Sequence, residues 1–105
     1  MAITHVTQAT FGQEVKDYAG AVLIDFWADW CMPCRMMAPT FEALAESRTD
    51  VKFCKVNVDE DPGLAMAYGI DAIPAFVLVK GGAAIDKAVG VMDSTQLEAF
   101  LEANL

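Results

Sequence analysis

The run AVLIDFW, Ala21 to Trp27, is the feature that most limits how this chain can fold. It has the length of a β-strand, and every residue in it except Asp25 is apolar. A strand with one face in solvent alternates apolar and polar residues, whereas a nearly continuous apolar run is typical of a strand covered on both faces. We therefore expect a central strand with helices on both sides of it.

Four other segments have the pattern of strands. The last two are separated by Lys80-Gly81-Gly82, a turn sequence typical of a hairpin between antiparallel strands. The four segments are residues 3–6, 51–58, 75–79 and 83–89.

Four helices are predicted from capping residues and from apolar residues spaced three and four apart. Pro39 lies within the second and is expected to bend it, because proline has no amide hydrogen to donate. Gly69 can end the third, and the fourth begins near Asp93. The segments are residues 10–20, 34–45, 61–67 and 93–101.

The predicted order is βαβαβαββα in a single domain, residues 1–105. Helical crossovers join parallel strands and a hairpin joins antiparallel ones, so the order implies an α/β fold. We expect a central mixed β-sheet of about five strands flanked by four helices.

Charge and cysteine content narrow the possible partners and compartments. The formal net charge of −8 disfavours nucleic acid and anionic membranes, and no apolar stretch approaches the roughly 20 residues of a membrane span. The acidic run at residues 59–61 is interpreted as a solvated loop. Three cysteines and no secretory signal favour the reducing cytoplasm, although a chain whose leader had been removed would look the same. We expect a monomer.

Cys31 and Cys34 lie at the start of the second predicted helix, directly after the central strand. Residues i and i+3 share one helix face, so the two sulfurs can form a disulfide with little backbone movement. The helix N-terminus favours the thiolate of Cys31, and Pro33 is tolerated in a first turn. Cys31 is the expected nucleophile, and Cys34, which we expect to be the more buried, is the expected resolving thiol.

A structural zinc site is another use of a Cys-x-x-Cys pair. Zinc takes four ligands, and the chain adds only Cys54 and His5, which form no second close pair, so no metal is expected. A permanent structural disulfide suits an oxidising compartment better than a reducing one. Cys54 is interpreted as a small buried apolar residue, with a regulatory thiol as the alternative.

The chain resembles the thioredoxin family over nearly its whole length. The matches are in register with the predicted elements, which makes them more specific than a Cys-x-x-Cys pair alone. The landmarks are Asp25, Trp27 and Trp30 in LIDFWADWC, Pro39, Lys55 in CKVNVDEDP, Ile73-Pro74 in YGIDAIPAF, Gly82 and Gly90.

The resemblance implies a protein-disulfide reductase with no bound cofactor, because the dithiol itself carries the electrons. Its partners would be disulfide-containing target proteins and a thioredoxin reductase, a flavin-containing enzyme that draws on NADPH. Asp25 would accept the proton of Cys34, and Lys55 would influence the charge of Asp25. Pro74 would follow a cis peptide bond beside the dithiol.

The resemblance also implies a docking surface for target proteins around Cys31. Ala72 and Ile73 would offer backbone to an extended target chain, as in strand addition. For the apolar residues of this surface, core packing is an equally good explanation. The surface comprises Trp30, Met32, Pro33, Ala72, Ile73, Pro74, Val89, Gly90 and Val91.

Three residues depart from the usual family pattern. Met32 stands where glycine is usual, Arg35 where lysine is usual, and Ala75 where threonine is usual. These departures leave the redox potential and the choice of partners open. Methionine brings no charge that would stabilise a thiolate, which favours a reductant. The alternatives are a disulfide-forming or isomerising oxidoreductase, and a scaffold subunit with incidental redox activity.

Overall fold

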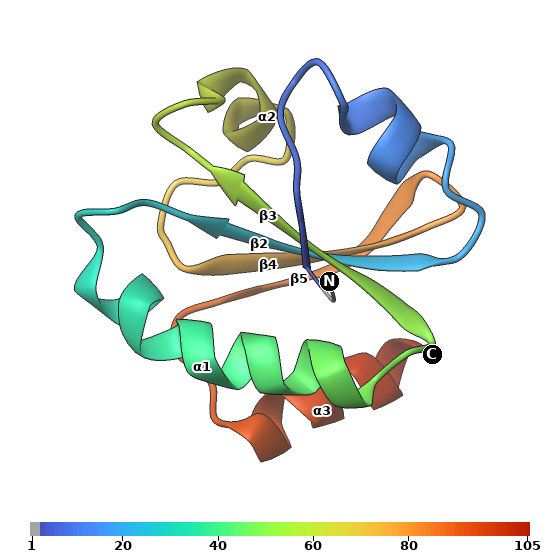
Figure 1. Ribbon diagram of the computed structural model, residues 1–105, viewed down its shortest axis with the longest axis vertical. Coiled ribbons are helices and arrows are strands. Elements are labelled where there is room, and N and C mark those ends of the chain that lie inside the picture. The colour runs from blue at the N-terminus through green and yellow to red at the C-terminus, as the bar shows by residue number, and fades with distance from the viewer. Residues whose placement is uncertain (1–2) are drawn as a thin grey trace.

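The computed structural model describes residues 3–105 and contains a five-stranded mixed sheet with helices on both faces (Figure 1). Its strand order is β1-β3-β2-β4-β5, in which β1, β3 and β2 run parallel and β4 and β5 are antiparallel to their neighbours. The predicted α/β class, mixed sheet and element order are confirmed. The elements are β1 (Ile3–His5), η1 (Gly12–Lys16), β2 (Ala21–Trp27), α1 (Met32–Ser47), β3 (Val51–Asn57), α2 (Pro62–Ala67), β4 (Ala75–Lys80), β5 (Ala83–Val89) and α3 (Ser94–Asn104).

The first helix is much shorter than predicted. Within residues 10–20 the helix is confined to Phe11 and η1, a π-helix in which the Asp17 amide donates to the Gly12 carbonyl oxygen at 2.8 Å. The ammonium of Lys52, on β3, lies 2.8 Å from the Glu14 carbonyl oxygen. In an α-helix that oxygen would accept the amide of residue 18, so the lysine takes the place of the next helical hydrogen bond.

Side chains of β2 point alternately into two cores, one on each face of the sheet. Val22, Ile24 and Phe26 join the core beneath η1 and α2. Leu23 joins the core beneath α1 and α3, where the Phe41 and Phe53 rings meet edge to face at 5.2 Å. Figure 1 shows α1 and α3 on one face and α2 on the other. The expectation that β2 is covered on both faces is therefore confirmed.

A capping box begins α3. The Asp93 carboxylate accepts the Gln96 amide at 2.8 Å, and the Gln96 side chain accepts the Asp93 amide at 2.9 Å. Asp93→Ala is expected to lower the free energy of unfolding by about 1 kcal/mol, because one amide loses its acceptor at the helix end. Urea unfolding would measure the loss. Ser94→Ala, at an exposed neighbouring position, is the control, and an equal loss in both variants would contradict the role of the cap.

Candidate active site

Cys31 and Cys34 form a disulfide at the N-terminus of α1, with their Cα atoms 5.3 Å apart. Cys31 is the N-cap of α1, in extended conformation, and the helix begins at Met32, so the expectation that Cys31 lies at the start of this helix is confirmed. The Cys34 amide donates to the Cys31 Sγ at 3.2 Å. An amide and a helix dipole that both point at one sulfur favour negative charge on that sulfur.

The two cysteines are almost equally buried, with 4% of Cys31 and 3% of Cys34 exposed. Cys34 is the more buried of the two, as expected, but the difference is small. Cys31 is covered because it lies in a buried cluster with Ala28 and Cys34, against which Val58 and Ile73 pack. Its Sγ lies 3.9 Å from the Ile73 carbonyl oxygen. The asymmetry between the thiols therefore lies in their hydrogen bonds rather than in their exposure.

The peptide bond between Ile73 and Pro74 is cis, as the family resemblance implied. The Gly90 amide donates to the Pro74 carbonyl oxygen at 2.8 Å, so the segment after β5 is tied to this loop. Gly90 has a φ of 103°, a conformation that residues with a Cβ rarely adopt. Three segments distant in the sequence thus meet around Cys31: the start of α1, the loop before β4 and the end of β5.

The proposed docking residues divide by exposure. Four large apolar side chains are exposed, namely Trp30 (70%), Met32 (61%), Val89 (54%) and Val91 (50%). Exposed apolar side chains that lie together mark interaction surfaces, so for these four residues docking is a better explanation than core packing. Of the remaining residues, Pro33 and Ala72 are exposed, Ile73 and Gly90 are partly buried, and Pro74 is buried.

Asp25 is a buried carboxyl on β2, with 1% of its surface exposed. Its Oδ1 atom has no hydrogen-bond partner among residues 3–105. Burial raises the pKa of Asp25 from 3.8 to about 7, and the charge of Lys55 opposes this rise. By strand alternation Asp25 faces α1 together with Leu23, so a carboxyl that can change charge near neutral pH lies on the side of the sheet that carries Cys34.

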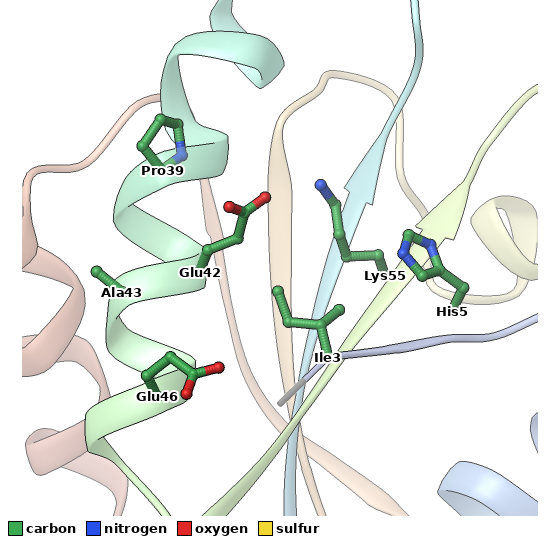
Figure 2. Close-up of a pocket in the computed structure, with 7 residues that line it drawn as sticks. All are labelled: Ile3, His5, Pro39, Glu42, Ala43, Glu46 and Lys55. Atoms are coloured by element: carbon green, nitrogen blue, oxygen red, sulfur yellow. The ribbon is translucent and has the colours of Figure 1, made fainter. Parts of the chain in front are cut away.

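Lys55 occupies the position on β3 that pairs with Asp25 in the sheet register. Its ammonium lies 4.7 Å from the centre of the Trp27 ring, at a distance suited to a cation–π contact. Lys55 also lines a cavity of about 770 Å³ between α1 and the β1–β3 edge of the sheet. Figure 2 shows Glu42 of α1 and Lys55 of β3 projecting into this cavity from opposite sides, with His5 of β1 to the right of Lys55.

The acidic run at residues 59–61 is not simply a solvated loop, as the sequence suggested. The Trp30 indole donates to the Asp59 Oδ2 at 2.8 Å, and the buried Asp61 accepts the Gln8 amide at 2.9 Å. The Asp59 carboxylate thus holds an exposed aromatic side chain beside the disulfide. No local sequence pattern indicated this pairing, because the two residues are 29 positions apart.

Cys54 lies in the core beneath η1 and α2, with no exposed surface. Burial raises the pKa of the Cys54 thiol to about 11. This agrees with the interpretation of Cys54 as a small buried apolar residue. Across residues 3–105 no three His, Cys, Asp or Glu side chains are grouped to hold a metal ion, and no helix combines the length and apolarity of a membrane span.

A disulfide at a helix N-terminus, on the side of a mixed five-stranded sheet that a buried carboxyl faces, is the arrangement of a thiol–disulfide oxidoreductase. Comparison with known proteins agrees: the thioredoxin family model matches residues 2–103. Thioredoxin 1 of Nostoc sp. is 46% identical over 99% of this chain and 98% of its own length. The thioredoxin of Pseudomonas aeruginosa is 41% identical over 98% of this chain and 96% of its own length. The chain belongs to the thioredoxin family.

Proposed function

We propose that this protein reduces disulfides in target proteins, with Cys31 as nucleophile and Cys34 as resolving thiol. The observation that carries these roles is the hydrogen bond from the Cys34 amide to the Cys31 Sγ at the start of α1. In the reduced protein the same amide stabilises the Cys31 thiolate. Attack by that thiolate joins Cys31 to one target sulfur and releases the other target sulfur as a thiolate. Attack by Cys34 on Cys31 then re-forms the intramolecular disulfide and releases the reduced target.

Asp25 accepts the proton that Cys34 loses before it attacks. A general base is most effective when its pKa is near the working pH, and the pKa of Asp25 is about 7. Lys55 favours the ionised form of Asp25, since its charge opposes the effect of burial. The cavity lined by Lys55 supports this role, because it opens between α1 and the sheet edge beside Lys55, the residue that pairs with Asp25 in the sheet.

Targets dock on the exposed apolar side chains around the disulfide. The Ala72–Ile73 backbone receives an extended target segment, and Pro74 positions that backbone beside Cys31. The short distance between the Cys31 Sγ and the Ile73 carbonyl oxygen, 3.9 Å, supports this arrangement. The apolar contacts come from Trp30, Met32, Pro33, Val89, Gly90 and Val91.

The dithiol passes electrons to target disulfides, so the protein acts as a reductant, and it does so in the cytoplasm. Met32 lies between the cysteines and provides no charge that would stabilise the reduced form and so make the disulfide a strong oxidant. A flavin-containing thioredoxin reductase returns electrons from NADPH to the disulfide. The family of the chain supports both assignments.

An insulin-reduction assay with NADPH and a thioredoxin reductase tests the proposal. We expect NADPH consumption that requires all three components, and a potential against glutathione close to about −270 mV. A potential near about −120 mV would instead indicate a disulfide-forming protein. Full biological activity in a chain with both Cys31→Ser and Cys34→Ser would indicate a scaffold.

A further inference from the structure

A second cavity, of about 380 Å³, lies beside the disulfide. Val58 and Ile73, which pack against the cluster of Ala28, Cys31 and Cys34, both line it, and the Ile73 carbonyl oxygen lies 3.9 Å from the Cys31 Sγ. A side chain placed in this cavity is therefore close to the sulfur that attacks a target. The other lining residues are Trp30, Ala65, Ile70, Asp71 and Ala72.

Asp71 is the only charged residue among those that line this cavity. Within the described part of the chain, residues 3–105, the cations of the ion pairs are Arg48 and Lys52, and neither is paired with Asp71. Lys87 donates to the Gly69 carbonyl oxygen at 3.3 Å rather than to a carboxylate. The carboxylate of Asp71 is therefore available to a cation from outside the chain.

Trp30 contributes an aromatic face to the same cavity and holds a second carboxylate, that of Asp59, next to it. Its indole is 70% exposed and donates to Asp59, so a carboxylate is held against the side chain that forms one wall. An aromatic face attracts cations as well as apolar groups. The cavity thus combines an apolar lining with a tryptophan and with a carboxylate that has no ion pair among residues 3–105.

We propose that this cavity, hereafter the Asp71 cavity, selects target segments that carry a lysine or arginine close to the reactive cysteine. The inference rests on the proposed reductase function and names its preferred substrates. The aliphatic stem of the cation packs against Ile70 and Ile73, while its charged end reaches Asp71. A target with glutamate at the same place meets Asp71 and Asp59 as like charges and is disfavoured.

Three disulfide-linked peptides that differ at one residue beside the reactive cysteine, Lys, Gln or Glu, test this selection with the full chain. We expect kcat/KM for the Lys peptide to exceed that for the Glu peptide about three- to tenfold, as ion pairs near a surface are worth at most about 1 kcal/mol each. The preference should shrink as salt is added. Asp71→Asn should bring the three values together, and Asp71→Lys should reverse their order.

Glu98→Gln is the matched control, because it removes the same charge from an exposed position on α3, across the sheet from α2. The Lys preference should persist in this variant. Equal rates for the three peptides with the unmodified chain would overturn the inference, as would a Lys preference that survives Asp71→Asn. Failure of the proposed function is distinguishable, because then none of the three peptides would be reduced.

Discussion

Replacing Cys31 with serine is expected to abolish the reduction of protein disulfides, lowering kcat/KM by at least about 1,000-fold. The reaction needs a thiolate at the end of α1, and a serine hydroxyl remains protonated there at neutral pH. The Cys34 amide would still have an oxygen to donate to, so the fold of the helix start is retained. Insulin reduction and urea unfolding would together separate lost chemistry from lost structure.

Cys34→Ser distinguishes the two thiol roles. With Cys31 intact and no resolving thiol, the first exchange goes forward and the mixed disulfide with the target accumulates. Mass spectrometry should find this adduct for Cys34→Ser and not for Cys31→Ser. Cys54→Ala is the control and should retain activity, because Cys54 lies in the other core. An adduct through Cys34 in the Cys31→Ser variant would reverse the assigned roles.

Asp25→Asn is expected to stabilise the protein at alkaline pH and to have little effect at acid pH. The pKa of Asp25 is raised in the folded protein, so near pH 5 the folded state holds a proton that the unfolded state has largely lost. Stability therefore falls as pH rises from about 3.8 to about 7, and stays reduced above that range. The difference between these two pKa values corresponds to about 4 kcal/mol at about 1.4 kcal/mol per pH unit.

Urea unfolding of the oxidised protein at pH 4 and pH 9 would measure this effect. The gain in free energy of unfolding should be large at pH 9 and small at pH 4. Asp29→Asn, at an exposed position after β2, is the matched control and should show no such contrast. A gain of equal size at both pH values would mean that the carboxylate is not destabilised by burial.

The same Asp25 variant is expected to slow the release of reduced target from the mixed disulfide. Asparagine cannot accept the proton of Cys34, so the resolution step loses its dependence on a group with a pKa near 7. Stopped-flow measurement of target release across pH would reveal the change. If release by Asp25→Asn followed the same pH profile as release by the unmodified chain, Asp25 would have no part in the proton transfer.

Local patterns in the sequence were sufficient for most of the fold. The apolar run of β2, the glycine turn between β4 and β5, and the cap at Asp93 each act through neighbouring residues. The prediction failed at η1, where Lys52 binds the Glu14 carbonyl oxygen from 38 positions away. A helix pattern does not reveal that a distant side chain will take one of its backbone acceptors.

In the candidate site, too, some features follow from local sequence patterns and others depend on contacts between distant residues. The Cys31–Cys34 spacing and the helix N-terminus are local, so the sequence could predict both the disulfide and the favoured thiolate. The equal burial of the two cysteines depends on Ile73, whose carbonyl oxygen reaches Cys31 across 42 positions. The hold of Asp59 on Trp30 likewise depends on how the ends of two parallel strands meet.

The amino-acid sequence by itself determined the class of fold and the redox pair, because strand length, turn chemistry and helix caps are interactions between near neighbours. The tertiary structure alone decided which carboxylates lie near the pair and in what state. Asp25 changes charge near neutral pH because the sheet and α1 exclude water from it. Asp71 is exposed at the wall of the cavity because of how the loop after α2 packs. Burial and exposure are properties of the assembled layers, and no segment specifies them alone.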